Sequence, residues 1–225
     1  MITIYYTSWD GKHGSRDLLR RAAADWCSRN IPRLETQDKG PAGEKAAGAG
    51  ALENKAHPAP RVEDGGKAAE WRPEEFIIEQ ADSRSKPRFL YPEGAEFSVT
   101  HTGNLWMCAF SHDPVGLDAE QERECPRRKL SHRFFCPEED AWLARKGDRG
   151  FFQVWTAKES YLKYTGEGLG RGMDSFCTVD EGGLRGSVEE VFQIHADFRA
   201  EDGQFLAVCV SSCAEGEILE WKSLE

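Results

Sequence analysis

Three strand-like segments follow one another in the middle of the chain, and they constrain the fold more than any other feature of the sequence. The segments are residues 97–100, 105–111 and 115–120. Thr102-Gly103-Asn104, between the first two, is typical of a hairpin turn. Residues 151–164 instead repeat apolar side chains at helical spacing, and Gly166 closes that helix. Strands mixed with helices predict an α/β (α+β) domain.

Other elements are expected on both sides of this central region. Residues 1–6 are typical of a strand, and residues 15–30 have helical spacing with Ser15 as a candidate N-cap. Residues 86–89 are predicted to form a loop. The remaining predictions are helices over residues 126–135 and 137–145 and a strand over residues 204–210.

The segment from about residue 35 to residue 70 differs from the rest in composition. It is rich in Gly, Ala, Lys, Pro and Glu and has almost no large apolar side chains. Such a segment cannot bury enough surface to offset the entropy lost on ordering. We therefore predict a flexible surface insertion in the N-terminal half.

The charge and hydropathy of the chain exclude several classes of protein. The net charge of -10 argues against a nucleic-acid binder, which normally has a basic face. No stretch approaches the roughly 20 apolar residues that span a bilayer, so no membrane segment is expected. The first residues are too short for a signal peptide and lack a basic lead-in. We expect a cytoplasmic monomer that carries reduced thiols, because the seven cysteines are scattered and contain no CxxC pair.

Two acidic residues lie on the strand predicted over residues 115–120. Because side chains alternate along a strand, Asp118 and Glu120 share one face, with Cα atoms about 6.5 Å apart. Carboxylates held this close repel each other unless a cation lies between them. Oxygen ligands alone favour a hard cation, magnesium first. A strand with one solvated face would show the same pattern and stays open as an alternative.

The helix predicted over residues 151–164 places a carboxylate on its apolar side. Helical spacing aligns Glu159 with Phe152, Trp155 and Leu162. A carboxylate near buried surface needs a partner or a metal. Glu159 could reach the same cation as the strand acids, or it could simply pair with Lys163 four residues on.

A histidine ends the strand before the glycine turn. His101 could donate hydrogen bonds to a phosphate from this position, although a single histidine is more often structural.

Several short segments together resemble one protein family. They are Phe97-Ser98-Val99-Thr100-His101, Val115-Gly116-Leu117-Asp118-Ala119-Glu120, Trp155-Thr156-Ala157-Lys158-Glu159-Ser160 with Lys163, Gly166-Glu167-Gly168-Leu169, Arg133-Phe134-Phe135-Cys136-Pro137-Glu138-Glu139 and Lys86-Pro87. In this order and spacing they resemble the Sfp-type 4'-phosphopantetheinyl transferases, which activate peptide and polyketide synthetases. The resemblance implies a pseudo-dimer of two similar α/β halves, residues 1–113 and 114–225, with the site between them.

The resemblance implies an enzyme, a holo-[carrier protein] synthase. It would move the 4'-phosphopantetheine arm of coenzyme A onto a serine of an apo acyl or peptidyl carrier protein and release 3',5'-ADP. Asp118, Glu120 and Glu159 would hold Mg²⁺ beside the pyrophosphate, and Glu159 would help to remove the serine proton. The resemblance leaves open whether the carrier serves fatty acid, polyketide or nonribosomal peptide biosynthesis.

The resemblance also assigns roles to basic and polar side chains. Lys158 and Lys163 would join Glu159 as catalytic residues, because they would contact phosphates and stabilise developing charge. The residues implied to bind the coenzyme A phosphates are Lys86, Thr100, His101 and Lys163.

Two alternatives remain open. The same carboxylates could serve a magnesium-dependent phosphohydrolase that uses water in place of serine, and coenzyme A-dependent labelling of a carrier protein would separate the two. The chain could also be a non-catalytic module that binds a carrier protein or coenzyme A. Retention of three carboxylates and two lysines speaks against such a module.

Overall fold

The structure of the protein is a computed structural model that describes residues 1–11, 14–31, 70–81, 85–146 and 149–224. The expected insertion at residues 35–70 falls almost entirely on residues 32–69, which lie outside the described residues. Among the described helices, none combines the length and apolar character needed to cross a membrane.

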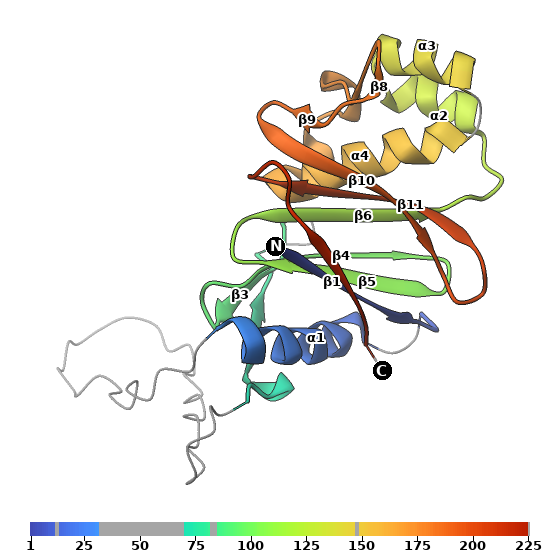
Figure 1. The fold of residues 1–225 in the computed structure, drawn as a ribbon. Helices are drawn as coiled ribbons and strands as arrows, with labels where there is room; N and C mark the ends of the chain where they lie inside the picture. Colours follow the sequence, from blue (N-terminus) through green and yellow to red (C-terminus); the bar gives the residue numbers. More distant parts are fainter. Residues whose placement is uncertain (12–13, 32–69, 82–84, 147–148, 225) are drawn as a thin grey trace, which may run out of the picture.

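The first sheet contains both the first and the last strand of the chain. Its strands lie in the order β12-β1-β5-β4. Their bounds are Leu219–Ser223 for β12, Ile2–Ser8 for β1, Leu105–Ser111 for β5 and Glu96–Thr102 for β4. β1 pairs in parallel with β12 and antiparallel with β5, so segments more than 200 residues apart lie side by side (Figure 1).

Helix α1 (Ser15–Asn30) covers the outer face of this sheet (Figure 1). The predicted apolar stripe is buried, with Leu19, Ala22 and Trp26 packed among Phe97 and Phe110. Fully burying a large apolar side chain contributes about 1.5–3 kcal/mol, so this stripe holds the helix on the sheet.

The start of α1 differs from the prediction. Gly14, not Ser15, occupies the N-cap position, and no side chain caps the helix there. The hydroxyl of Ser15 instead accepts a hydrogen bond of 2.8 Å from the Trp106 indole N–H of β5. The serine therefore ties the helix to the sheet, because a buried indole N–H needs an acceptor.

The second sheet has the strand order β6-β11-β10-β9. The bounds are Val115–Gln121 for β6, Phe205–Ser212 for β11, Val191–Arg199 for β10 and Ser187–Val188 for β9. Helix α4 (Arg149–Thr165) packs on the outer face of β6 and β11. Two shorter helices, α2 (Arg127–Phe134) and α3 (Pro137–Lys146), lie beyond it (Figure 1).

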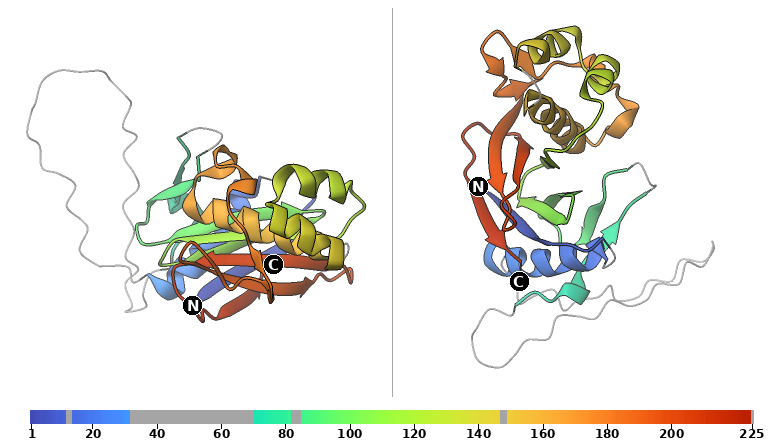
Figure 2. Two further views of the ribbon diagram at one scale, coloured as in Figure 1. Left: turned by 90° about the horizontal axis from the view of Figure 1, so that it is seen from above. Right: turned by 90° about the vertical axis from the view of Figure 1, so that its right-hand side faces the viewer.

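The two sheets pack against each other through their inner faces. Ile4 and Met107 of the first sheet share one buried cluster with Leu117 and Val208 of the second. The helices lie outside this pair of sheets, with α1 at one end and α2–α4 at the other (Figure 2).

Short elements complete the fold. They are η1 (Pro73–Glu75), β2 (Ile77–Glu79), β3 (Arg88–Tyr91), η2 (Gly168–Gly170), η3 (Met173–Ser175), β7 (Val179–Asp180) and β8 (Gly183–Leu184). The predicted loop over residues 86–89 is wrong in its second half, because Arg88 and Phe89 belong to β3. There Phe89 is paired with Ile78 of β2 and packs into the α1 cluster.

Each half of the chain repeats one order of elements. β1, α1 and the β4–β5 hairpin are followed by β6, α4 and the β10–β11 hairpin, and in both cases the second hairpin strand pairs with the first strand. The pseudo-dimer that the resemblance implies, with halves at residues 1–113 and 114–225, stays a prediction. β12 departs from it, because it lies after residue 113 and yet joins the first sheet.

Candidate active site

The two sheets meet along the neighbouring strands β4 and β6. Hydroxyl side chains of β4 bridge this junction. Ser98 Oγ accepts a hydrogen bond of 2.9 Å from the backbone N–H of Leu117, and Thr102 Oγ1 accepts one of 3.1 Å from the N–H of Gln121. These bonds fix the register of β6 against β4, and they fix with it the positions of the acidic side chains on β6.

Asp118 lies at the centre of the junction and is only 5% exposed. Its Oδ1 accepts hydrogen bonds from the Thr100 hydroxyl at 2.9 Å and from the Lys163 ammonium of α4 at 2.7 Å. Its other oxygen, Oδ2, is buried and has no hydrogen-bond partner among the described residues. A buried carboxylate oxygen without a partner is costly, so it is suited to a bound cation.

Glu120 follows Asp118 on the same face of β6, as strand alternation predicts. Its carboxylate accepts a hydrogen bond of 3.2 Å from the Thr102 hydroxyl and pairs with Arg123 at 2.5 Å. The Glu120 side chain is 18% exposed, so this carboxylate lies nearer to solvent than that of Asp118.

Glu159 approaches the two strand acids from α4. Burial is the largest cause that raises the pKa of Glu159, the Asp118 carboxylate raises it further, Lys163 lowers it, and Glu120 also raises it. The three carboxylates therefore form one electrostatic group, as the sequence pattern indicated. The alternative was that Glu159 simply pairs with Lys163. In the structure the Lys163 ammonium forms its ion pair with Asp118 instead.

Gly116 allows α4 to approach β6 this closely. A Cβ atom at this position would lie 2.0 Å from the Ser160 carbonyl oxygen and 2.6 Å from the Tyr164 nitrogen. Any other residue on β6 here would push the helix away, and Glu159 and Lys163 would move with it.

The three carboxylates are spread wider than one coordination sphere. Among the described residues, the only three potential metal ligands with atoms all within 4.8 Å of one another are Cys136, Glu138 and Cys177. Ligation of one ion by all three acids of the junction would thus require side-chain rotation.

A pocket of about 210 Å³ opens beside these groups. Glu159 and Lys163 line it together with Lys86. The Lys86 ammonium donates a 2.8 Å hydrogen bond to the Val115 carbonyl oxygen, and burial lowers the pKa of Lys86. Three of the predicted site residues therefore share one cavity at the junction of the two sheets.

Comparison with known proteins assigns the family. A model of the 4'-phosphopantetheinyl transferase superfamily matches residues 114–210. The 4'-phosphopantetheinyl transferase ffp of Bacillus subtilis is 30% identical over 153 residues, which are 61% of this chain and 67% of ffp. The chain belongs to the 4'-phosphopantetheinyl transferase superfamily.

Two further relatives match shorter parts of the chain. The 4'-phosphopantetheinyl transferase gsp of Aneurinibacillus migulanus is 33% identical over 108 residues, or 46% of this chain and 44% of gsp. The 4'-phosphopantetheinyl transferase Sfp of Bacillus subtilis (strain 168) is 35% identical over 86 residues, or 36% of this chain and 38% of Sfp. In these matches the chain spans less than half the length of either relative.

Lys158 does not lie in the candidate active site, where the sequence analysis placed it. The side chain is wholly buried and pairs with the equally buried Glu139 of α3 at 2.8 Å. Its ammonium also donates to the carbonyl oxygens of Met173 and Phe176, each at 2.6 Å. An ammonium has three donors, and all three are used, so the predicted phosphate contact and catalytic role of Lys158 are wrong.

Thr100 and His101 point to opposite sides of β4. The buried Thr100 hydroxyl donates to Asp118, so its predicted role as a phosphate ligand is replaced by one of orienting this carboxylate. His101 is exposed on the other side, where its ring packs against Trp9 at a centroid distance of 4.9 Å. The strand alternation that joins Thr100 to the acids thus separates His101 from them.

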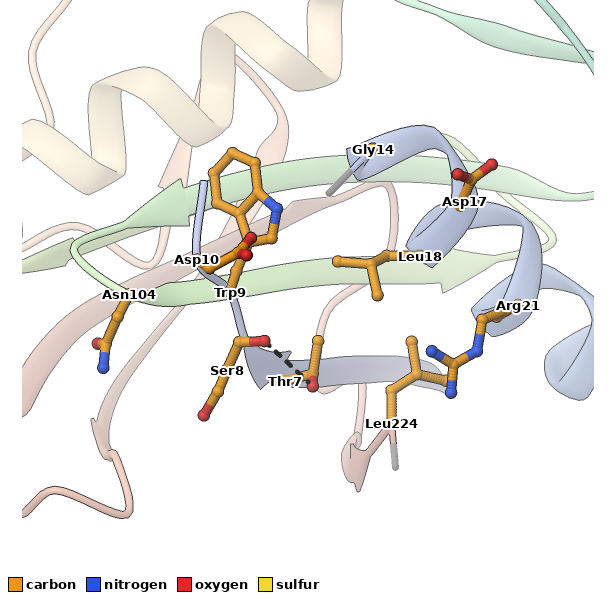
Figure 3. Close-up of a pocket in the computed structure, with 10 residues that line it drawn as sticks. All are labelled: Thr7, Ser8, Trp9, Asp10, Gly14, Asp17, Leu18, Arg21, Asn104 and Leu224. Carbon is orange, nitrogen blue, oxygen red and sulfur yellow. Dashed lines mark hydrogen bonds between the residues drawn. The ribbon is translucent and has the colours of Figure 1, made fainter. Parts of the chain in front are cut away.

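A groove of about 720 Å³ lies beside Trp9, at the end of β1 (Figure 3). Asn104 and Leu224 line it from the strand side, and Arg21 reaches it from α1. His101 lies next to this groove through its contact with Trp9, outside the segment that the superfamily model matches.

The sequence analysis missed the hydroxyls of Ser98 and Thr102 and the cation of Arg123. The first two had a visible signal, since hydroxyl residues alternate at positions 98, 100 and 102 of a predicted strand. Arg123 lies three residues after Glu120 in a segment without a clear element, so no pattern indicated its pairing.

Proposed function

We propose that this protein transfers the 4'-phosphopantetheine arm of coenzyme A to a serine hydroxyl of an apo acyl or peptidyl carrier protein. The second product is 3',5'-ADP. The observation that carries the proposal is the gathering of Asp118, Glu120, Glu159 and Lys163 around one junction in a chain of this superfamily. The named activity of the relatives supports the same reaction.

The donor set fits a hard divalent cation. The three acids offer only oxygen atoms, which Mg²⁺ prefers. The unpartnered Oδ2 of Asp118 and the carboxylates that raise the pKa of Glu159 would both gain from a nearby positive charge. Held by Asp118, Glu120 and Glu159, Mg²⁺ would neutralise the pyrophosphate charge of coenzyme A.

Glu159 is the proposed general base. It lines the pocket, so its carboxylate can accept the proton of a hydroxyl bound there. As the serine hydroxyl loses its proton to Glu159, the serine oxygen bonds to the β-phosphorus of coenzyme A. The bond from this phosphorus to the bridging oxygen breaks, and 3',5'-ADP carries that oxygen away.

Lys163 and Lys86 are the proposed phosphate contacts. Both line the pocket, and each ammonium has donors beyond the one used by Asp118 or Val115. Cations placed beside developing negative charge lower the barrier to phosphoryl transfer. His101 also remains a proposed phosphate ligand, although its exposed ring packs against Trp9 on the other side of β4 from this pocket.

The pocket lining suits an arm with a phosphate at one end. Lys163 and Glu159 provide the polar part, and Pro87, Val99 and Leu162 provide apolar walls. An apolar cavity with a few placed polar groups is typical of sites for small ligands.

Incubation with coenzyme A, Mg²⁺ and a panel of apo carrier proteins tests the proposal, with intact mass as the readout. We expect one carrier to gain the mass of a single phosphopantetheine arm, EDTA to stop the reaction, and added Mg²⁺ to restore it. Cleavage of coenzyme A without labelling of any carrier would indicate a phosphohydrolase and contradict the proposal.

A further inference from the structure

Two cysteines outside the candidate active site lie unusually close together. Cys136 Sγ and Cys177 Sγ are 2.6 Å apart, although both are free thiols. Cys136 directly precedes α3, and Cys177 lies between η3 and β7. A disulfide has an S–S length of about 2.05 Å, so the two sulfur atoms need to move less than about 1 Å to become bonded.

The buried carboxylate of Glu139 holds the two thiols close together. Glu139 Oε2 accepts a 3.0 Å hydrogen bond from the Cys136 N–H. Glu139 Oε1 accepts two from Thr178, at 2.7 Å from its N–H and 2.8 Å from its hydroxyl. Because Thr178 directly follows Cys177, one carboxylate holds both cysteine-bearing segments. Lys158 in turn fixes this carboxylate at 2.8 Å.

The two thiols differ in accessibility. Cys136 is 5% exposed, whereas Cys177 is partly exposed. A reagent from solution therefore reaches Cys177 first and leaves Cys136 as the second thiol. A proton acceptor lies near the thiol of Cys136, because a carboxylate oxygen of the exposed Glu138 is within 4.8 Å of Cys136 Sγ.

We propose that Cys136 and Cys177 form a reversible disulfide by exchange with a low-molecular-weight disulfide, R–S–S–R. The Cys177 thiolate bonds to one sulfur of the reagent and displaces R–S⁻, which takes up a proton as R–SH. Cys136 then loses its proton and bonds to Cys177 Sγ, and the second R–S⁻ leaves. The two protein thiols are oxidised together by two electrons, and the reagent is reduced to two R–SH.

A metal ion is the competing occupant of this cluster. The ligand atoms of Cys136, Glu138 and Cys177 all lie within 4.8 Å of one another. Two thiolates on one tetrahedral zinc ion lie about 3.7 Å apart, which exceeds the observed distance by about 1 Å. The geometry therefore favours the disulfide.

The bond would close a loop that contains α3 and α4. Restricting this loop in the unfolded chain should raise the melting temperature by on the order of 5 °C. This effect does not depend on the proposed transfer reaction, since neither thiol lines the pocket beside Glu159.

The test treats the purified full chain with oxidised glutathione and compares it with the reduced protein. We expect the intact mass to show the loss of two hydrogens, a non-reducing digest to give a linked pair of peptides carrying Cys136 and Cys177, and dithiothreitol to reverse both. Cys136→Ser should stop at a glutathione adduct on Cys177. Cys213→Ser, which removes an exposed cysteine outside the pair, should form the same bond as the unchanged protein.

Two outcomes would overturn the proposal. One is oxidation that yields only glutathione adducts and no linked peptide pair. The other is one equivalent of zinc that co-purifies with the unchanged chain, protects both thiols and is lost in Cys177→Ser, since that result would assign the cluster to a metal. The linked peptide pair and the co-purified zinc are both measured on the unchanged protein, so these two readouts hold even if a variant fails to fold.

Discussion

Helix α4 carries two lysines, each paired with a carboxylate, and the two pairs differ in how completely their atoms are satisfied. Lys158 and Glu139 are wholly buried, and the three ammonium donors and both carboxylate oxygens have partners. In the second pair, Lys163 is 29% exposed and the Oδ2 atom of Asp118 lacks a partner among the described residues.

This difference separates a pair with a structural role from a pair that we propose to serve the reaction. A fully satisfied pair has no donor or acceptor left for a ligand, and it fixes how α3 and the segment before β7 pack on α4. An incompletely satisfied pair at the wall of a pocket still has a free carboxylate oxygen and free ammonium donors. These atoms can bind a cation or a phosphate.

The largest effect is expected from breaking the satisfied pair. Lys158→Ala leaves the Glu139 carboxylate buried without its counter-charge, which should cost about 3–5 kcal/mol of unfolding free energy. Urea titration would measure the loss. A matched Glu139→Gln/Lys158→Met variant should regain part of it, because no buried charge then remains. A Lys158→Ala protein as stable as the parent would contradict the structural role.

The next effect concerns the contact that brings the unsatisfied pair into position. Gly116→Ala places a Cβ atom against α4 and should cost about 1–3 kcal/mol, as overpacking does. Thermal unfolding is the measurement. Gly186→Ala is the control, because a Cβ atom there meets nothing within 4 Å. Equal melting temperatures for the two variants would show that α4 does not depend on Gly116.

A smaller stability effect and a large loss of activity are expected at Asp118. Asp118→Ala removes one acceptor shared by Thr100 and Lys163, at a cost of about 1 kcal/mol. Transfer to a carrier protein should fall at least about 100-fold, because the central carboxylate of the site is lost. Retained transfer together with a large drop in melting temperature would reverse this assignment.

The smallest stability effect is a gain. The pKa of Glu159 is raised in the folded protein, so its ionised form opposes folding, and stability is lost as the pH rises through the folded-state pKa. In EDTA at neutral pH, Glu159→Gln should therefore melt above the parent, and this advantage should disappear at acidic pH. Differential scanning calorimetry at two pH values would detect the crossover, and a lower melting temperature at neutral pH would refute it.

Short-range patterns predicted much of the candidate site. Alternation over residues 115–120 placed Asp118 and Glu120 on one face, and helical spacing placed Glu159 on a partly buried face of α4 that lines the pocket. These predictions succeed because the period of a strand or a helix fixes the direction of each side chain. Lys158 and Lys163, in contrast, were given the same role, because a local pattern does not reveal a partner such as Glu139 on another helix.

The fold shows the same limit. Most strands and helices were predicted to within a few residues, whereas the pairing of β12 with β1 was not. That pairing joins the two ends of the chain, and no local period records a contact over such a separation. The hydroxyl contacts from β4 to β6 were missed for the same reason, although each strand was predicted.

The rate of carrier-protein labelling per folded molecule tests the central distinction most directly. It is measured for Lys163→Ala and for Glu139→Gln/Lys158→Met at a temperature where circular dichroism shows both to be folded. We expect the double variant to retain transfer within a few-fold of the parent, and Lys163→Ala to lose most of it. The opposite ranking would show that Lys158 serves the reaction and that Lys163 does not.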